Sequence, residues 1–166
     1  MILGSAAPGF ISTWGRFGMT MNANKFVLEV GASLENLSVI STAISEAMRE
    51  AGMDAAVIPR IILAIDEACT NIALYAYPKR KGYIRLAFWL DHGDFVISIE
   101  DQGQPFNPCS VPPPRFDVSL NERRVGGLGI HLMRQLMDEI SYTYDPMTGN
   151  QLTMRKHVGT GNPGSE

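Results

Sequence analysis

Two strand–turn–strand segments dominate the pattern of this sequence. In the first, residues 82–90 (GYIRLAFWL) and 94–101 (DFVISIED) are joined by the turn DHGD. In the second, residues 140–144 (ISYTY) and 150–157 (NQLTMRKH) are joined by DPMTG. Alternating apolar residues bounded by turn-forming residues predict two β-hairpins. An antiparallel sheet is therefore expected as the framework, and the alternating segment 25–31 (KFVLEVG) adds a further strand.

Three segments with helical periodicity lie between these strands. The first follows Ser33, a potential N-cap, and ends at Gly52. The second begins near Pro59, which a first helical turn tolerates, and stops before Pro78. The third covers residues 127–139, with its apolar side formed by Ile130, Met133, Leu136, Met137 and Ile140. Amphipathic helices must cover a sheet, so the pattern predicts an α/β two-layer sandwich. Its mixed, mostly antiparallel sheet is covered on one face by helices.

Composition and chain length predict one folded domain. The chain has 166 residues, of which 45% are hydrophobic and 19% charged, and this is typical of a globular protein. Residues 1–23 lack periodicity and are predicted to be a flexible leader, 24–158 the folded domain, and 159–166 a flexible tail. Residues 102–125 are rich in proline and also lack periodicity. So long a loop in a compact domain predicts a functional lid.

The charge and the remaining reactive residues exclude several classes of protein. A net charge of −3 without a basic stripe argues against a direct nucleic-acid partner. No apolar run is long enough to cross a membrane, and no signal peptide is evident, so a cytoplasmic location is predicted. Cys69 and Cys109 have no histidine at metal-ligand spacing and are expected to be unpaired thiols. His92, His131 and His157 are interpreted as surface or packing residues.

Two pairs of residues, each containing one carboxylate, are candidates for a functional site. Glu67 and Asn71 lie one turn apart on the largely apolar second helix, where they form either a solvated edge or a site. Asp101 ends a central strand, and a carboxylate there costs free energy unless it has a donor to accept. Gly103 follows two residues later, and it either completes a simple turn or lets a ligand approach the backbone.

A third cluster is the glycine-rich start of the last helix, made by Gly126, Gly127 and Gly129. Free backbone N–H groups and the dipole at a helix N-terminus attract phosphate. No Gly-Lys-Ser/Thr follows and no strand directly precedes the glycines, so neither a Walker loop nor the dinucleotide fingerprint is present. A hinge for the lid is the alternative interpretation.

Taken together, the order and spacing of the three clusters resemble the GHKL ATPase superfamily, and most closely its anti-sigma factor serine/threonine-protein kinases. DEACTN resembles their Glu-x-x-x-Asn box, DQGQPF their Asp-x-Gly box, and GGLGI their lid-closing glycines. The segment LMDEISY resembles the same kinases, and the likeness runs from about residue 24 to 158. Asn107 departs from the aspartate of many relatives, which affects only a local lid contact.

The resemblance implies a Bergerat-type ATP-binding fold, including an unusual left-handed β-α-β connection, and it implies roles for individual residues. Asn71 would coordinate magnesium, and Glu67 would be the base toward the attacking hydroxyl. Asp101 would accept the adenine amino group, Gly103 would make room for the base, and Thr153 would support the Asp101 carboxylate. The phosphates would be wrapped by Gly126, Gly127, Leu128 and Gly129.

By the same resemblance, the expected function is that of an ATP-dependent protein serine/threonine kinase and anti-sigma factor. It would use ATP and Mg²⁺, phosphorylate an anti-sigma antagonist protein on Ser or Thr, sequester a sigma factor and form a homodimer. Two alternatives stay open. One is a nucleotide-gated binding module without significant kinase activity. The other is a stand-alone catalytic domain of a histidine kinase, although the lysine common three residues after that asparagine is absent here.

Overall fold

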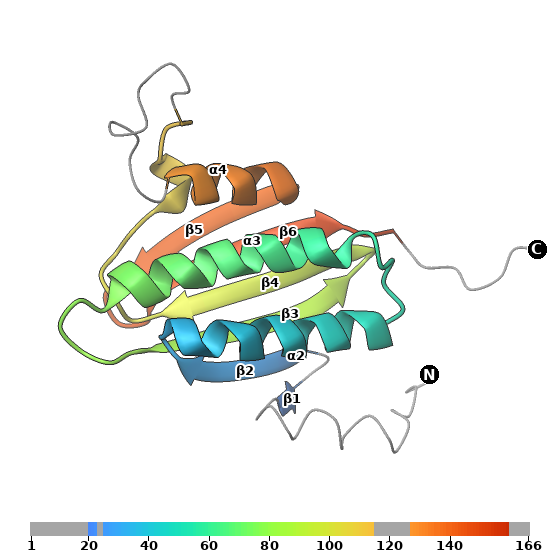
Figure 1. The fold of residues 1–166 in the computed structure, drawn as a ribbon, viewed down its shortest axis with the longest axis horizontal. Coiled ribbons are helices and arrows are strands. Elements are labelled where there is room, and N and C mark those ends of the chain that lie inside the picture. The colour runs from blue at the N-terminus through green and yellow to red at the C-terminus, as the bar shows by residue number, and fades with distance from the viewer. Residues whose placement is uncertain (1–19, 23–24, 115–126, 160–166) are drawn as a thin grey trace, which may run out of the picture.

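The protein is a two-layer sandwich in which helices cover one face of a sheet (Figure 1). The computed structural model describes residues 20–22, 25–114 and 127–159. The strands are β1 (Thr20–Asn22), β2 (Lys25–Gly31), β3 (Tyr83–Asp91), β4 (Asp94–Asp101), β5 (Glu139–Asp145) and β6 (Gly149–His157). The helices are α2 (Leu37–Glu50), α3 (Ile58–Asn71) and α4 (Gly127–Leu136), with short 3-10 turns at Leu34–Asn36 and Pro108–Ser110. The predicted fold class is thus confirmed.

The sheet order β1-β2-β3-β4-β6-β5 follows from the two predicted hairpins. Every neighbouring pair of described strands is antiparallel, so the sheet is more uniform than the predicted mixed one. Because β4 and β5 both run antiparallel to β6, they run in the same direction on either side of it. The segment containing α4 connects them as a crossover. The left-handedness expected for a connection of this kind stays a prediction.

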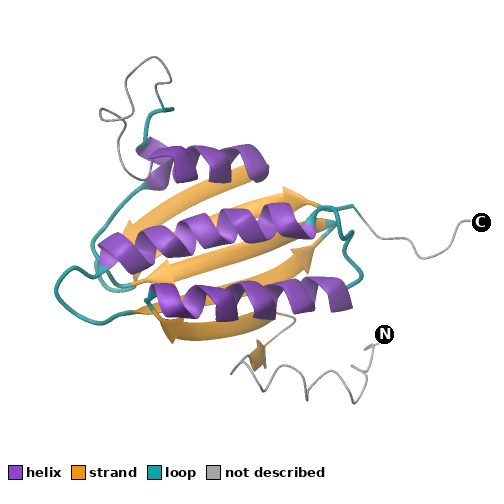
Figure 2. Cartoon of the chain, in the orientation of Figure 1, coloured by secondary structure: helices purple, strands orange, loops and turns teal. Residues whose placement is uncertain are grey.

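The core lies between the helical layer and the sheet (Figure 2). Leu28 of β2, Ile97 of β4 and Met154 of β6 are fully buried on the covered face, and Ile40 of α2 and Ile65 of α3 meet them from the other layer. These residues belong to the apolar stripes and alternations in the sequence. Burial of those stripes therefore holds the two layers together.

Two helix boundaries differ from the prediction. Ser33 precedes a 3-10 turn rather than α2 itself, and its side chain makes no capping hydrogen bond. The last helix ends at Leu136, and Ile140, predicted on its apolar side, lies in β5. The reason is that the backbone N–H of Asp138 donates to the carbonyl of Arg155, which draws the chain into pairing with β6.

The N-terminal boundary is also corrected. Residues 20–22, predicted to belong to a flexible leader, form β1 and pair with the edge of β2, where Thr20 lies opposite Val27. The rest of the predicted leader, residues 115–125 of the predicted lid, and most of the predicted tail lie outside the described residues. No helix in the described part of the chain is long and apolar enough to cross a membrane.

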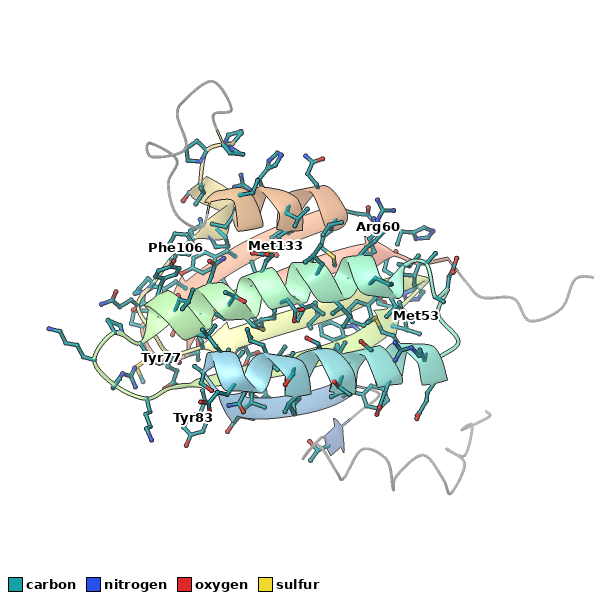
Figure 3. All side chains as sticks on the ribbon, in the orientation of Figure 1. Met53, Arg60, Tyr77, Tyr83, Phe106 and Met133 are labelled. Carbon is teal, nitrogen blue, oxygen red and sulfur yellow. The ribbon has the colours of Figure 1, made fainter. Side chains whose placement is uncertain are left out.

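A wide turn after α3 brings several side chains to one end of the molecule. Following Asn71, the helix continues as a π-turn over Ile72–Ala76. In the sequence, Tyr75 continues the helical spacing of Ala68 and Ile72 and is therefore predicted on the apolar stripe of this helix. The extra residue of the π-turn rotates the positions after it, and Tyr75 is half exposed. Figure 3 labels Tyr77, Tyr83 and Phe106 at this same end. Wide turns of this kind are frequent at functional sites, and here the turn borders a pocket.

Candidate functional site

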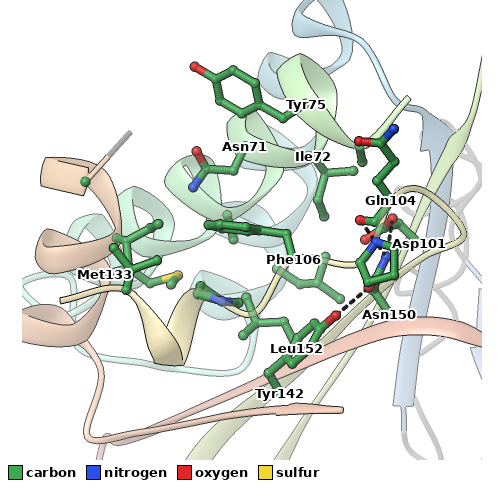
Figure 4. A pocket seen from close by; sticks show the side chains of 18 residues that line it. Asn71, Ile72, Tyr75, Asp101, Gln104, Phe106, Met133, Tyr142, Asn150 and Leu152 are labelled. Carbon is green, nitrogen blue, oxygen red and sulfur yellow. Dashed lines mark hydrogen bonds between the residues drawn. The ribbon is translucent and has the colours of Figure 1, made fainter. Parts of the chain in front are cut away.

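A pocket of about 380 Å³ lies between the end of α3, the start of α4 and the sheet (Figure 4). Its size is within the range of small-molecule sites. Its walls are mainly apolar and include Ile72 of the π-turn, Ile99 of β4, Met133 of α4 and Leu152 of β6. Phe106, from the segment after β4, also lines it and is half exposed. A flat apolar ring fits such walls better than a charged group does.

Asp101 is the acidic group of this pocket and is oriented by two donors. Only 7% of the residue is exposed. Its Oδ1 accepts hydrogen bonds from the Gly103 N–H at 2.7 Å and from Asn150 Nδ2 at 3.0 Å. No described residue donates to Oδ2. Burial raises the pKa of the Asp101 carboxyl, and the two hydrogen bonds oppose that shift. One oxygen is therefore fixed by the protein, and the other is left for a donor on a ligand.

Asn150, which the sequence analysis did not single out, supports Asp101. It lies directly opposite Asp101 in the β4–β6 ladder. Its Oδ1 accepts from the Tyr142 hydroxyl at 2.6 Å, so Nδ2 is turned toward the carboxylate. Thr153, predicted for this supporting role, pairs instead with Ser98. An offset of three residues along a strand places Thr153 on the opposite face of the sheet from Asn150. The assignment of Thr153 is wrong.

Gly103 has a structural reason for lacking a side chain. A Cβ at this position would lie 2.5 Å from both the Cβ and the carbonyl oxygen of Ala76. The neighbouring Gln104 N–H donates to that same carbonyl at 2.8 Å. The turn after β4 therefore rests against the π-turn of α3. That Gly103 also makes room for a ligand ring stays a prediction.

Of the two residues predicted on the second helix, Asn71 lies at the pocket and Glu67 lies against α4. Asn71 lines the pocket, and its side chain makes no hydrogen bond with a described residue. Glu67, one turn earlier, is half-buried and does not line the pocket. Its carboxylate lies against the first turn of α4, because a Cβ on Gly129 would overlap with Glu67 Oε2. Because Gly129 has no side chain, the Glu67 carboxylate can occupy the space beside it.

The glycine cluster meets the pocket at one residue. Gly127 lines the pocket at the N-terminus of α4, and a Cβ there would meet no atom of the described residues within 4 Å. Leu128 is largely exposed, at 61%. Gly126 lies outside the described residues. A helix of ten residues that begins at the pocket offers backbone N–H groups and a positive dipole end to an anion.

The donor set fits a magnesium ion that arrives with phosphates better than a resident metal. Among the described residues, no group of three or more His, Cys, Asp or Glu side chains could hold a metal ion. Magnesium is usually held through one or two protein oxygens, with waters and substrate phosphates completing its shell. The amide oxygen of Asn71 at the pocket can supply one such oxygen.

Comparisons with known proteins match most of the chain. Residues 30–156 match the family model described as histidine kinase-like ATPase domain. The chain is 30% identical over 137 residues to the serine-protein kinase RsbW of Staphylococcus aureus, covering 79% of this chain and 85% of the relative. It is 28% identical over 138 residues to RsbW of Bacillus mycoides, covering 81% and 85%.

A solved structure supports the fold. The crystal structure of the RsbU and RsbW domains of a Mycobacterium tuberculosis protein superposes with a TM-score of 0.58 at 19% identity. The match covers 84% of this chain but only 34% of that longer one. At this identity the likeness concerns the fold alone.

Proposed function

Because this chain belongs to the histidine kinase-like ATPase family and, within it, to the serine-protein kinases named RsbW, we propose that it is an ATP-dependent protein serine/threonine kinase and anti-sigma factor. Its protein substrate is an anti-sigma antagonist that presents a serine or threonine, and its second partner is a sigma factor. We further propose Mg²⁺ as the metal, a homodimer as the assembly and the cytoplasm as the location.

The observation that carries this proposal is the carboxylate of Asp101 inside an apolar pocket. One oxygen is occupied by Gly103 and Asn150, and the other has no donor among the described residues. Adenine offers a flat apolar ring with an amino group that donates at its edge. Guanine carries a carbonyl oxygen at the corresponding place and would be repelled by the carboxylate. The pocket therefore favours an adenine nucleotide.

The residues on the α3–α4 side suit the transfer of the terminal phosphate. When bound, magnesium would neutralise charge on the phosphates, and Asn71 would hold it through its amide oxygen. The N-terminal N–H groups of α4 would bind phosphate oxygens. Glu67 would accept the proton of the attacking hydroxyl from its place beside the first turn of α4.

The binding-module alternative differs in a single respect, because it needs the pocket but not the base. We therefore propose separating the two with Glu67→Ala and Asn71→Ala. Glu67 does not line the pocket, so Glu67→Ala should leave ATP affinity nearly unchanged while phosphotransfer falls by roughly 10²–10⁴-fold. Asn71→Ala should weaken both, because Asn71 does line it.

The measurements are calorimetric ATP affinity with magnesium and single-turnover phosphotransfer to a serine-bearing antagonist protein. Glu50→Ala, which removes an exposed carboxylate from another helix, is the matched control. Phosphotransfer at the parental rate by Glu67→Ala would disprove its role as the base. If the parent transfers no phosphate but binds ATP, the binding-module function is the better description.

A further inference from the structure

A loop outside the pocket holds the turn that comes after Asp101. Residues 77–83 run from the π-turn that follows α3 to the first residue of β3, and we call them the clamp loop. The hydroxyl of Tyr77 accepts a hydrogen bond from the Gln102 N–H at 2.7 Å. The guanidinium of Arg80 donates to the Gln102 carbonyl at 2.6 Å. Both backbone polar groups of the residue next to Asp101 are therefore held by the clamp loop.

The ring of Tyr77 is itself fixed from several sides. Its hydroxyl donates to the carbonyl of Tyr83 at 3.0 Å. A Cβ on Gly82 would overlap with the ring, so the glycine lets the backbone pack directly on it. Arg80 lies over the ring, 5.1 Å from its centroid. Burial raises the pKa of Tyr77, although the hydrogen bond from the Gln102 N–H opposes that rise. The phenol is therefore protonated at neutral pH and able to donate.

The hydroxyl also stands where the sheet would otherwise continue. The β3–β4 ladder ends with the pair Ile84 and Asp101. One step beyond, the Tyr77 hydroxyl bridges the Tyr83 carbonyl and the Gln102 N–H, two groups that face each other across the strands. The phenol thus separates the strand ends and directs the chain after Asp101 toward the pocket. A simple connection between α3 and β3 would need none of these contacts.

We propose that Tyr77 and Arg80 are positioning residues that fix the orientation of Asp101 and thereby set affinity and selectivity for adenine nucleotides. Neither residue lines the pocket. The clamp loop acts through the backbone of the turn after β4, at the end of the molecule where Figure 3 labels Tyr77 and Tyr83. This inference rests on the proposed nucleotide site and adds the residues that tune it.

The test compares Tyr77→Phe with Tyr83→Phe. The first variant keeps the ring on Gly82 but removes the hydroxyl that bridges to Gln102. The second removes a largely exposed hydroxyl that bonds to no described residue, and it leaves the Tyr83 carbonyl in place. Calorimetric Kd values for ATP and GTP with magnesium, and the thermal midpoint of unfolding, are measured for both.

Tyr77→Phe should weaken ATP binding by roughly 3- to 10-fold and lower the preference for ATP over GTP by a similar factor. Tyr83→Phe should change neither. Arg80→Met, which keeps the apolar stem without the donor, should also lower the preference, and Arg80→Lys should restore part of it. A lower thermal midpoint with unchanged nucleotide preference in Tyr77→Phe and Arg80→Met would overturn the clamp and leave the proposed function standing. A parent protein that binds no adenine nucleotide would overturn both.

Discussion

Replacement of Asp101 by asparagine is the sharpest test of the pocket. The side chain keeps its size, and the structure fixes how the new amide would sit. The Gly103 N–H and Asn150 Nδ2 both donate to Oδ1, so the amide oxygen should take that place. The amide nitrogen then takes the place of Oδ2, where a purine amino group would meet a donor instead of an acceptor. In the flipped orientation, the amide nitrogen would face two donors of the protein.

The expected loss is that of one charge-assisted hydrogen bond, about 1.5–3 kcal/mol, or roughly a ten- to hundred-fold weaker Kd for ATP. Isothermal titration with magnesium present measures it directly. Asp54→Asn, at an exposed aspartate that does not line the pocket, is the matched control and should bind ATP like the parent. An ATP affinity that is the same in Asp101→Asn and in the parent would refute the assignment of Asp101 to adenine.

The same variant should also change how the stability of the protein depends on pH. Burial raises the pKa of Asp101 in the folded state, so the folded protein binds its proton more tightly than the unfolded chain does. In the parent, protonation of Asp101 contributes its whole stabilisation at pH values below the ordinary carboxyl pKa. This contribution is lost as the pH rises through the pKa of Asp101 in the folded protein. Asparagine is neutral throughout. The free energy of unfolding of Asp101→Asn, relative to the parent, should therefore be higher at pH 7 than near pH 4, as urea titrations at both pH values can show.

Three further outcomes test the surroundings of the site. Gly129→Ala places a methyl group where the Glu67 carboxylate lies, so the rate of single-turnover phosphotransfer should fall on the order of 10²-fold. An unchanged rate would contradict the packing of Glu67 against Gly129. Asn150→Ala removes a buried side chain with several hydrogen bonds, and urea titration should show a free energy of unfolding lower by about 2–3 kcal/mol. A change under about 0.5 kcal/mol would contradict the supporting role of Asn150. Cys69 is fully buried, and burial raises the pKa of its thiol, whereas Cys109 is exposed. A thiol reagent should therefore label Cys109 alone in the native protein and both cysteines in denaturant. Labelling of both in the native protein would contradict the burial of Cys69.

Much of the fold was accessible from the sequence because its elements carry strong local signals. The β3–β4 hairpin alternates over its whole length, and a short turn rich in Asp and Gly joins its strands. β1 gave no such signal, because three residues are too few for a pattern and their pairing depends on the neighbouring edge of β2. The end of α4 differs from the prediction for a related reason. Leu136, Met137 and Ile140 continue the helical spacing, yet strand pairing determines where the helix stops.

The same contrast applies to the site, where some residues can be predicted from one element and others depend on contacts between distant parts of the chain. Asp101 and Asn71 were identified from their positions within single elements, and the pocket brings them together. Asn150 could not be identified in that way, because its partner is 49 residues away and only the register of β4 with β6 places the two side chains opposite each other. The role predicted for Thr153 rests on the resemblance alone, and Thr153 lies three positions from Asn150 along β6, on the opposite face of the sheet.

The two ends of α3 have different physical tasks, and this accounts for the polar residues within an apolar helix. Toward its start, Ile61 and Ile65 are fully buried and hold the helix to the sheet. Toward its end, Asn71 turns to the pocket, and the adjoining π-turn brings Ala76 and Tyr77 onto the backbone after β4. A regular helix would have kept Tyr75 on the buried stripe, as the spacing predicted. The π-turn leaves Tyr75 half exposed. It also connects Asn71, the residue proposed to hold magnesium, to the turn that orients Asp101.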